Sequence, residues 1–252
     1  MRCKSKTGRK QRRVSPWFLR GVFLLLLVPV IILAGRTVRL FRVQVDLSYA
    51  CTALRSDDNL LQRMAARKLG KAGPPPAAIP DLLDNLRDDS WAVAAESAWC
   101  LGRMKTAPQS IVTQELREAL HHPHREVRRY AAYSLAEHGP RSRAALPQLR
   151  ELISDSHMGY MACRAIRCIG VNNEIAGEEL VRELVELTES SHMGERYESV
   201  LTLGTLMPLP PEASEAIIRC SLDEEEIVRC AANDVQRQME VVGTAVERAR
   251  PN

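Results

Sequence analysis

Small and apolar residues recur along the chain in a pattern that repeats about every 34 residues. Two small or apolar residues are followed by two variable positions and then by Leu-Gly or a close equivalent. The six occurrences begin at Ala65, Ser97, Ala131, Ala165, Ser199 and Ala231, in steps of 32, 34, 34, 34 and 32 residues. A second apolar column keeps the same register at Leu54, Leu86, Leu120, Ile153, Leu187 and Leu222. A fixed period of this length is typical of a repeat array.

Each repeat divides into two predicted helices that are joined by a polar turn. In the second repeat, the leucine-rich segment 79–86 is followed by a turn at 87–90 and then by a second helix with a face of small residues. Asp and Ser in such turns accept hydrogen bonds from the free amides of the next helix. One hairpin cannot bury its apolar face alone, so the hairpins must stack. We therefore predict an all-α fold, an α-solenoid of about six two-helix repeats from about Asp46 to about Glu240, followed by a C-terminal tail at 241–252.

The second helices resemble those of HEAT repeats, in particular the short form found in phycobilin-lyase-type proteins. The motifs Arg63-x-Ala65-Ala66-x-x-Leu69-Gly70 and Val127-Arg128-x-x-Ala131-Ala132-x-x-Leu135 carry this resemblance, which extends over about 195 residues. It implies a ladder between repeats, built from an Asp in each turn and an Arg on each second helix. The pairs Asp57/Arg63 and Asp223/Arg229 keep both residues. The middle repeats do not, because Asp89 precedes Ala95, Pro123 precedes Arg129 and Ser191 precedes Tyr197.

An apolar segment near the N-terminus predicts a membrane anchor. The uncharged run from Gly21 to Gly35 extends back to Trp17, which gives 19 residues. A spanning helix needs roughly 17–25 residues. We expect a basic tail at 1–16, a transmembrane helix at 17–35 and a juxtamembrane linker at 36–45. A cleaved signal peptide is the alternative, although its basic region would be long and the cleavage pattern near Ala34 is poor.

The distribution of charge sets the predicted orientation and disfavours nucleic acid as a partner. Residues 1–43 hold 11 Lys and Arg and no acidic residue, which leaves 24 basic against 31 acidic residues in the rest of the chain. An acidic folded part repels phosphate backbones, so nucleic-acid binding is not expected. Because positive flanks stay in the cytoplasm, we predict a single-pass membrane protein with a cytoplasmic N-terminus and extracytoplasmic, periplasmic repeats.

No motif for catalysis, cofactor binding or metal binding is evident. The seven cysteines include no CxxC pair, and most fall on predicted helices, which favours buried, reduced thiols. His121, His122 and His124 form a local cluster, but it lies in a predicted turn where polar residues are expected, so we predict no metal site. We expect no cofactor and no enzymatic activity.

The face of the second helices that points away from the core is the best candidate for a binding surface. In the repeat register, the positions on this face are occupied by Arg67, Glu96, Trp99, Tyr130, Tyr133, Arg164 and Arg167. Trp, Tyr and Arg are the residues enriched at binding hot spots. The alternative is that Trp99 and Tyr133 pack against neighbouring repeats.

These observations predict a membrane-anchored scaffold that binds another protein through the solenoid groove. The alternative function follows from the resemblance: a lyase-like or chaperone-type protein that acts on a chromophore-carrying or modified protein.

Overall fold

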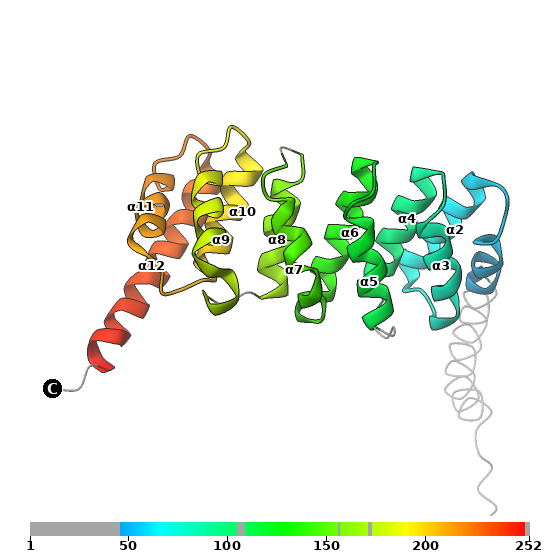
Figure 1. Ribbon diagram of the computed structural model, residues 1–252, viewed down its shortest axis with the longest axis horizontal. Helices are drawn as coiled ribbons and strands as arrows, with labels where there is room; N and C mark the ends of the chain where they lie inside the picture. The colour runs from blue at the N-terminus through cyan, green and yellow to red at the C-terminus, as the bar shows by residue number, and fades with distance from the viewer. Residues whose placement is uncertain (1–45, 105–108, 156, 171–172, 250–252) are drawn as a thin grey trace, which may run out of the picture. The chain divides into compact units, whose positions relative to one another are not determined.

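The computed structural model describes residues 46–104, 109–155, 157–170 and 173–249. All regular structure in these ranges is helical (Figure 1). The repeats belong to a compact unit that begins at Ala50. The prediction of an all-helical solenoid is confirmed.

Six helical hairpins follow one another along the chain, with a first and a second helix in each. The second helices are α2 (Asn59–Ala72), α4 (Trp91–Gly102), α6 (Arg125–His138), α8 (Gly159–Ile169), α10 (Met193–Gly204) and α12 (Glu226–Ala249). The first helices are residues 46–53, α3 (Ile79–Leu86), α5 (Gln109–Ala119), α7 (Leu146–Glu151), α9 (Asn173–Leu187) and α11 (Pro211–Cys220). Short 3-10 turns, η1 (Pro76–Ala78) and η2 (Gly139–Ala145), lead into α3 and α7.

The helices form two layers. In one layer, each second helix contacts the next, so that α2, α4, α6, α8, α10 and α12 make a continuous row. In the other layer, α3 contacts α5, α5 and α7 contact η2, and α9 contacts α11. Figure 1 shows the hairpins side by side in chain order. The interior lies between these layers, as expected for hairpins that bury their apolar faces by stacking.

The paired residues of the repeat pattern are buried on the second helices, and ten of them are small. All twelve are buried: Ala65, Ala66, Ser97, Ala98, Ala131, Ala132, Ala165, Ile166, Ser199, Val200, Ala231 and Ala232. The approach is closest at Gly102, where an added Cβ would lie 2.7 Å from the Cα of Ser134. Ser134 lies against α4 and donates its hydroxyl to the carbonyl of Ala98 at 2.7 Å. The spacing of these helices therefore depends on small residues, which explains why the pattern is so regular.

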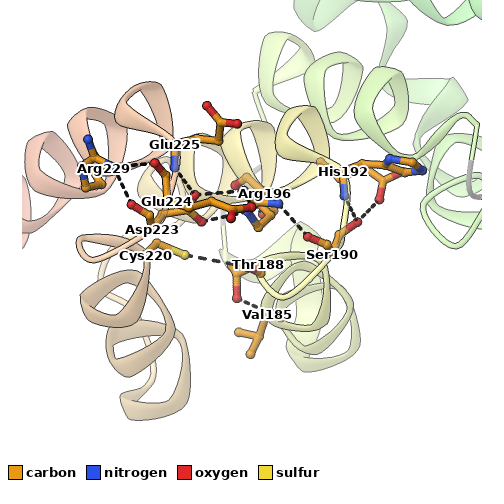
Figure 2. Close-up of polar contacts among 12 residues, drawn as sticks. Val185, Thr188, Ser190, His192, Arg196, Cys220, Asp223, Glu224, Glu225 and Arg229 are labelled. Carbon is orange, nitrogen blue, oxygen red and sulfur yellow. Dashed lines mark hydrogen bonds and ion pairs between the residues drawn. The ribbon is translucent and has the colours of Figure 1, made fainter.

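An arginine–aspartate ladder joins the turns of adjacent repeats, although not through the residues expected from sequence. Arg196 of α10 makes two hydrogen bonds to Asp223 in the next turn, Nε to Oδ2 at 2.8 Å and Nη2 to Oδ1 at 2.9 Å (Figure 2). It also donates to the carbonyl of Ser190 in its own repeat, at 2.9 Å. Arg128 repeats this arrangement in the third hairpin, since it donates to the carbonyl of His122 and lies 3.5 Å from Asp155 in the next turn.

The pairs expected at the two ends of the array have other arrangements. Arg229 donates to the backbone carbonyls of Asp223 and Glu224, whereas the Asp223 carboxylate is held by Arg196 (Figure 2). Within the described residues, no ion pair joins Asp57 to Arg63. The central repeats therefore do have ladder contacts, made by arginines that stand one position earlier in the helix than expected.

Two helices differ from regular geometry. Helix α9 bends at Gly177, whose φ of 66° lies in the left-handed region that glycine adopts readily. Helix α12 continues to Ala249, through the segment that the sequence suggested as a C-terminal tail.

The predicted membrane localisation requires correction. No helix among the described residues is both long and apolar enough to cross a bilayer. The longest, α12, has 24 residues but carries charged side chains throughout its length. The predicted transmembrane segment at 17–35 lies outside the described residues, together with the basic tail and the linker up to residue 45. The prediction of a single-pass membrane protein with periplasmic repeats is therefore wrong.

Candidate partner-binding surface

The seven residues predicted to bind a partner lie on four consecutive second helices, α2, α4, α6 and α8. Because each of these helices contacts the next, the seven positions belong to one continuous layer. We call the solvent-exposed side of these four helices the second-helix face. The side chains on it are connected from repeat to repeat.

Two of the predicted arginines pair with glutamates on the following second helix. Arg67 Nη1 lies 3.7 Å from Glu96 Oε1, and the arginine side chain is 60% exposed against 13% for the glutamate. Arg167 donates through Nε and Nη2 to Glu198 Oε2 of α10, at 3.1 and 2.8 Å. The Glu198 side chain is buried. The hydrogen-bonded Arg167–Glu198 pair therefore orders this part of the face, and Glu96 has little surface left for a partner.

Trp99 packs on the preceding repeat. An added Cβ at Gly70 would lie 2.8 Å from Cε3 of the indole ring, so the ring covers the α2 backbone at this glycine. The side chain is half-buried. Trp99 thus makes the contact with a neighbouring repeat that was considered as the alternative to partner binding, while part of its surface remains accessible.

Tyr130, Tyr133 and Arg164 form the central cluster of the second-helix face. The Arg164 guanidinium lies 5.7 Å from the centroid of the Tyr133 ring. A hydrogen bond with Tyr160 raises the pKa of Arg164 above its ordinary value, so the guanidinium is charged at all relevant pH values. Arg129, the residue before Tyr130 in α6, lies 5.0 Å from the Tyr130 ring centroid. All three residues of the cluster are partly exposed.

A cleft of about 610 Å³ lies at the ends of α2, α4 and α6. Its charged lining consists of Lys71, Arg103, Glu137 and Arg141, beside His138 and the backbone of three glycines. Sequence reasoning missed this cleft. Lys71 stands four residues after Arg67, Arg103 four after Trp99 and Glu137 four after Tyr133. Residues four apart share a helix face, so extending the predicted face by one helical turn would have found it.

His138 closes one side of the cleft but is itself buried. Its Nε2 lies 3.1 Å from the carbonyl of Leu101, which makes this nitrogen the donor. Burial lowers the pKa of His138 below its ordinary value, so the ring is neutral. Its contact with α4 is part of the packing between repeats.

The histidine cluster at 121–124 serves the turn itself. His122 Nδ1 accepts a hydrogen bond from the amide of His124, and His124 Nδ1 accepts one from the amide of Glu126. His124 also stacks on Trp91, with ring centroids 4.0 Å apart. The histidines therefore act as Asn or Asp would at a helix start. Within the described ranges, no group of three or more His, Cys, Asp or Glu is placed to hold a metal ion.

The cysteines of the described repeats are free thiols. Burial raises the pKa of Cys100 and of Cys163, so both thiols are protonated and unreactive as nucleophiles. They act as small apolar side chains between helices.

Comparison with known protein families supports a HEAT-type assignment of the repeats. The family model for HEAT repeats matches residues 48–113, and that for the PBS lyase HEAT-like repeat matches residues 127–155. Together the two matches fall in the first four hairpins and support the repeat family expected from the second-helix motifs. Comparison with curated protein sequences gives no significant match.

Several solved structures share the fold. An engineered protein aligns with a TM-score of 0.64 and 22% identity, over 78% of this chain and 99% of its own. A designed armadillo repeat protein in complex with peptide (KR)4 aligns with a TM-score of 0.60 and 19% identity, over 77% of this chain and 99% of its own. The complex of CpcE and CpcF of phycocyanin lyase from Nostoc sp. PCC7120 aligns with a TM-score of 0.58 and 19% identity, over 74% of each chain. At this level of identity the similarity concerns the fold.

Proposed function

We propose that the repeat unit is a protein-binding scaffold whose partner lies on the second-helix face. The observation that carries this proposal is the cluster of Tyr130, Tyr133 and Arg164, which is partly exposed at the centre of the face. Tyr presents a large contact area at a low loss of conformational entropy, and Tyr and Arg are enriched among the residues that dominate binding energy at interfaces.

The hydrogen-bonded pair beside the cluster supports the same proposal. Arg167 donates two hydrogen bonds to the buried Glu198, which orders this side of the face before a partner binds. A surface that is ordered before binding loses less entropy when a partner arrives. Proteins of similar fold also bind other chains, since one solved structure holds a peptide and another is a complex of two subunits.

A co-purification experiment tests the proposal. The variant Tyr130→Ser/Tyr133→Ser removes the two rings, and Ile111→Ser/Ile218→Ser removes two exposed apolar side chains of the first helices as a control. Both should keep helical circular dichroism. We expect the tyrosine variant to lose the proteins that co-purify with the tagged full-length chain, and the isoleucine variant to retain them. Equal recovery with both variants would refute the assignment of this face.

The second candidate is a lyase-like or chaperone-type role towards a chromophore-carrying protein. It is favoured by the match of residues 127–155 to the PBS lyase HEAT-like repeat and by the fold shared with CpcE and CpcF. Co-expression with a phycocyanin subunit and its chromophore distinguishes the two roles. A coloured, covalently modified product favours the second candidate, and an unmodified product favours the scaffold.

A further inference from the structure

We infer that the second-helix face binds an acidic peptide segment of its partner. This inference rests on the proposed function and gives the chemistry of the partner. It follows from the charges on the face, which differ in sign from those on the rest of the repeat unit.

The two helix layers carry opposite charge in the first four repeats. In these repeats the second helices α2, α4, α6 and α8 together hold nine basic and three acidic residues. The first helices, which are residues 46–53, α3, α5 and α7, hold two basic and six acidic residues. The excess of acidic residues in the folded part therefore belongs mainly to the first helices, while the second-helix face is basic.

Three cations on this face make no ion pair with an acidic side chain among the described residues, although Glu198, which pairs with Arg167, also interacts with Arg164 at longer range. Lys71, Arg103 and Arg164 form no salt bridge within the described residues, in contrast to Arg67, Arg129 and Arg167, which are paired with glutamates. They come from α2, from the end of α4 and from α8. A peptide with several carboxylates could therefore pair with one cation on each of these helices, and no glutamate of the chain would have to be displaced.

Arg164 is the best positioned of the three. It lies over the Tyr133 ring and is hydrogen-bonded to Tyr160, so its guanidinium is held in place before a ligand arrives. A planar guanidinium donates two parallel hydrogen bonds to a carboxylate. The exposed parts of Tyr130 and Tyr133 provide apolar contact beside it for the neighbouring side chains of a peptide.

The length of the face fits a short extended peptide. Packed helices lie roughly 8–10 Å apart, so the row from α2 to α8 covers about 24–30 Å. Eight extended residues cover about 26–29 Å at roughly 3.3–3.6 Å each. Every second side chain of an extended peptide points to the same side, so an acidic octapeptide can thus reach all three cations.

A protein segment fits this face better than a nucleic acid does. Glu96 and Glu137 lie on the same face and would repel a continuous phosphate backbone. A short peptide can instead place its uncharged backbone beside these glutamates. Aromatic side chains do bind nucleobases, so an oligonucleotide is included in the test.

Fluorescence anisotropy with the full-length chain tests the inference. The probes are labelled octapeptides, (Glu-Asp)4, its uncharged counterpart (Gln-Asn)4 and the basic (Lys-Arg)4, together with a labelled oligothymidylate. We expect (Glu-Asp)4 to bind at least about tenfold more tightly than (Gln-Asn)4 and to weaken as salt is added, since several exposed charge pairs contribute. The basic peptide should not bind measurably.

Three variants locate the binding site. Lys71→Gln/Arg103→Gln/Arg164→Gln should lose about tenfold in affinity for (Glu-Asp)4. Lys71→Gln/Arg103→Gln keeps the contact between Tyr133 and Arg164 and should lose a smaller factor. The control Arg143→Gln/Arg182→Gln/Arg219→Gln removes the same charge from the first-helix layer and should bind as the unchanged chain does.

The possible results separate the inference from the proposed function. Three results would overturn the inference of an acidic partner. They are binding of (Glu-Asp)4 no tighter than that of (Gln-Asn)4, tighter binding of (Lys-Arg)4, and an equal loss of affinity for (Glu-Asp)4 in the control variant Arg143→Gln/Arg182→Gln/Arg219→Gln. Oligothymidylate that binds more tightly than (Glu-Asp)4 and displaces it would overturn it in favour of nucleic acid. If one of these results occurs while Tyr130→Ser/Tyr133→Ser still loses the co-purifying protein, the proposed scaffold function is retained and only the inference of an acidic partner is refuted.

Discussion

The ion pair between Arg196 and Asp223 gives the strongest prediction about stability. Within the described residues, it is the only salt bridge in which both side chains are less than a tenth exposed, at 8% and 9%. Arg196→Gln removes the cation and its two hydrogen bonds to Asp223, while the carboxylate keeps the hydrogen bond from the Glu225 amide. Losing hydrogen bonds to a charged group costs about 1.5–3 kcal/mol, so we expect a destabilisation of this size.

Urea unfolding followed by far-UV circular dichroism measures the effect. Arg219→Gln is the matched control, because Arg219 and Glu189 also join neighbouring repeats but are 54% and 70% exposed. An exposed pair contributes about 0–1 kcal/mol. Arg196→Gln should also lower the melting temperature by roughly 2–4 °C per kcal/mol for a unit of this size. If the two variants lose the same stability, the turn ladder does not hold the repeats together.

The pH dependence of the same pair provides an independent check. The hydrogen bonds from Arg196 hold the pKa of Asp223 below its ordinary value. The stabilisation is therefore fully present above the pKa of an unfolded aspartate, about 3.9, and is lost as the pH falls through the folded value. The difference in unfolding free energy between the unchanged chain and Arg196→Gln should shrink below about pH 4. A difference that stays constant down to pH 2 would contradict an ionic origin.

Two further predictions concern the packing of second helices. Gly102→Ala should cost about 1–3 kcal/mol in urea unfolding, because the new methyl group would lie 2.7 Å from the Cα of Ser134; an unchanged midpoint would show that the helices can separate freely. Burial lowers the pKa of His138, so folding disfavours its protonation, and stability should fall as the pH drops below the unfolded value of about 6.5. His138→Gln should reduce this loss, and an identical pH profile for both proteins would refute the assignment.

The fold could be predicted from sequence because each repeat needs similar residues at the same positions. Second helices that pack closely favour small residues where they are buried, so Ala65, Ala131 and Ala165 recur at equivalent positions. The polar turns could also be predicted, because the free amides at the start of each helix need hydrogen-bond acceptors. Asp58 meets this need by accepting a hydrogen bond from Leu60.

The ladder could not be placed from the sequence because it depends on how one turn faces the next. Reading Asp and Arg at fixed offsets gave Asp57 with Arg63, and these two side chains do not pair. The structure uses Arg128 and Arg196 instead, and Arg128 reaches an aspartate 27 residues further along. A shift of one position on a helix changes the side-chain direction by 100°, so the pattern alone does not identify the arginine that points at the next turn.

The candidate surface was predicted in part. The helical offsets identified the four helices and the Tyr–Arg cluster on them. They did not show that Glu96 is largely covered by its pairing with Arg67, because that pairing joins two helices whose distance is unknown from sequence. The role of His124 could not be predicted from the sequence either, because histidine seldom caps a helix.

Site-specific photocrosslinking tests most directly whether the second-helix face is the binding surface. Benzoylphenylalanine replaces Tyr130 in one version of the full-length chain and Ile111, on the first-helix layer, in another. Both are irradiated in the cells from which the chain comes. We predict that the probe at Tyr130 captures a distinct protein through an acidic segment, identified by mass spectrometry, and that the probe at Ile111 does not. Capture of the same protein only from Ile111, or equally from both positions, would contradict the account.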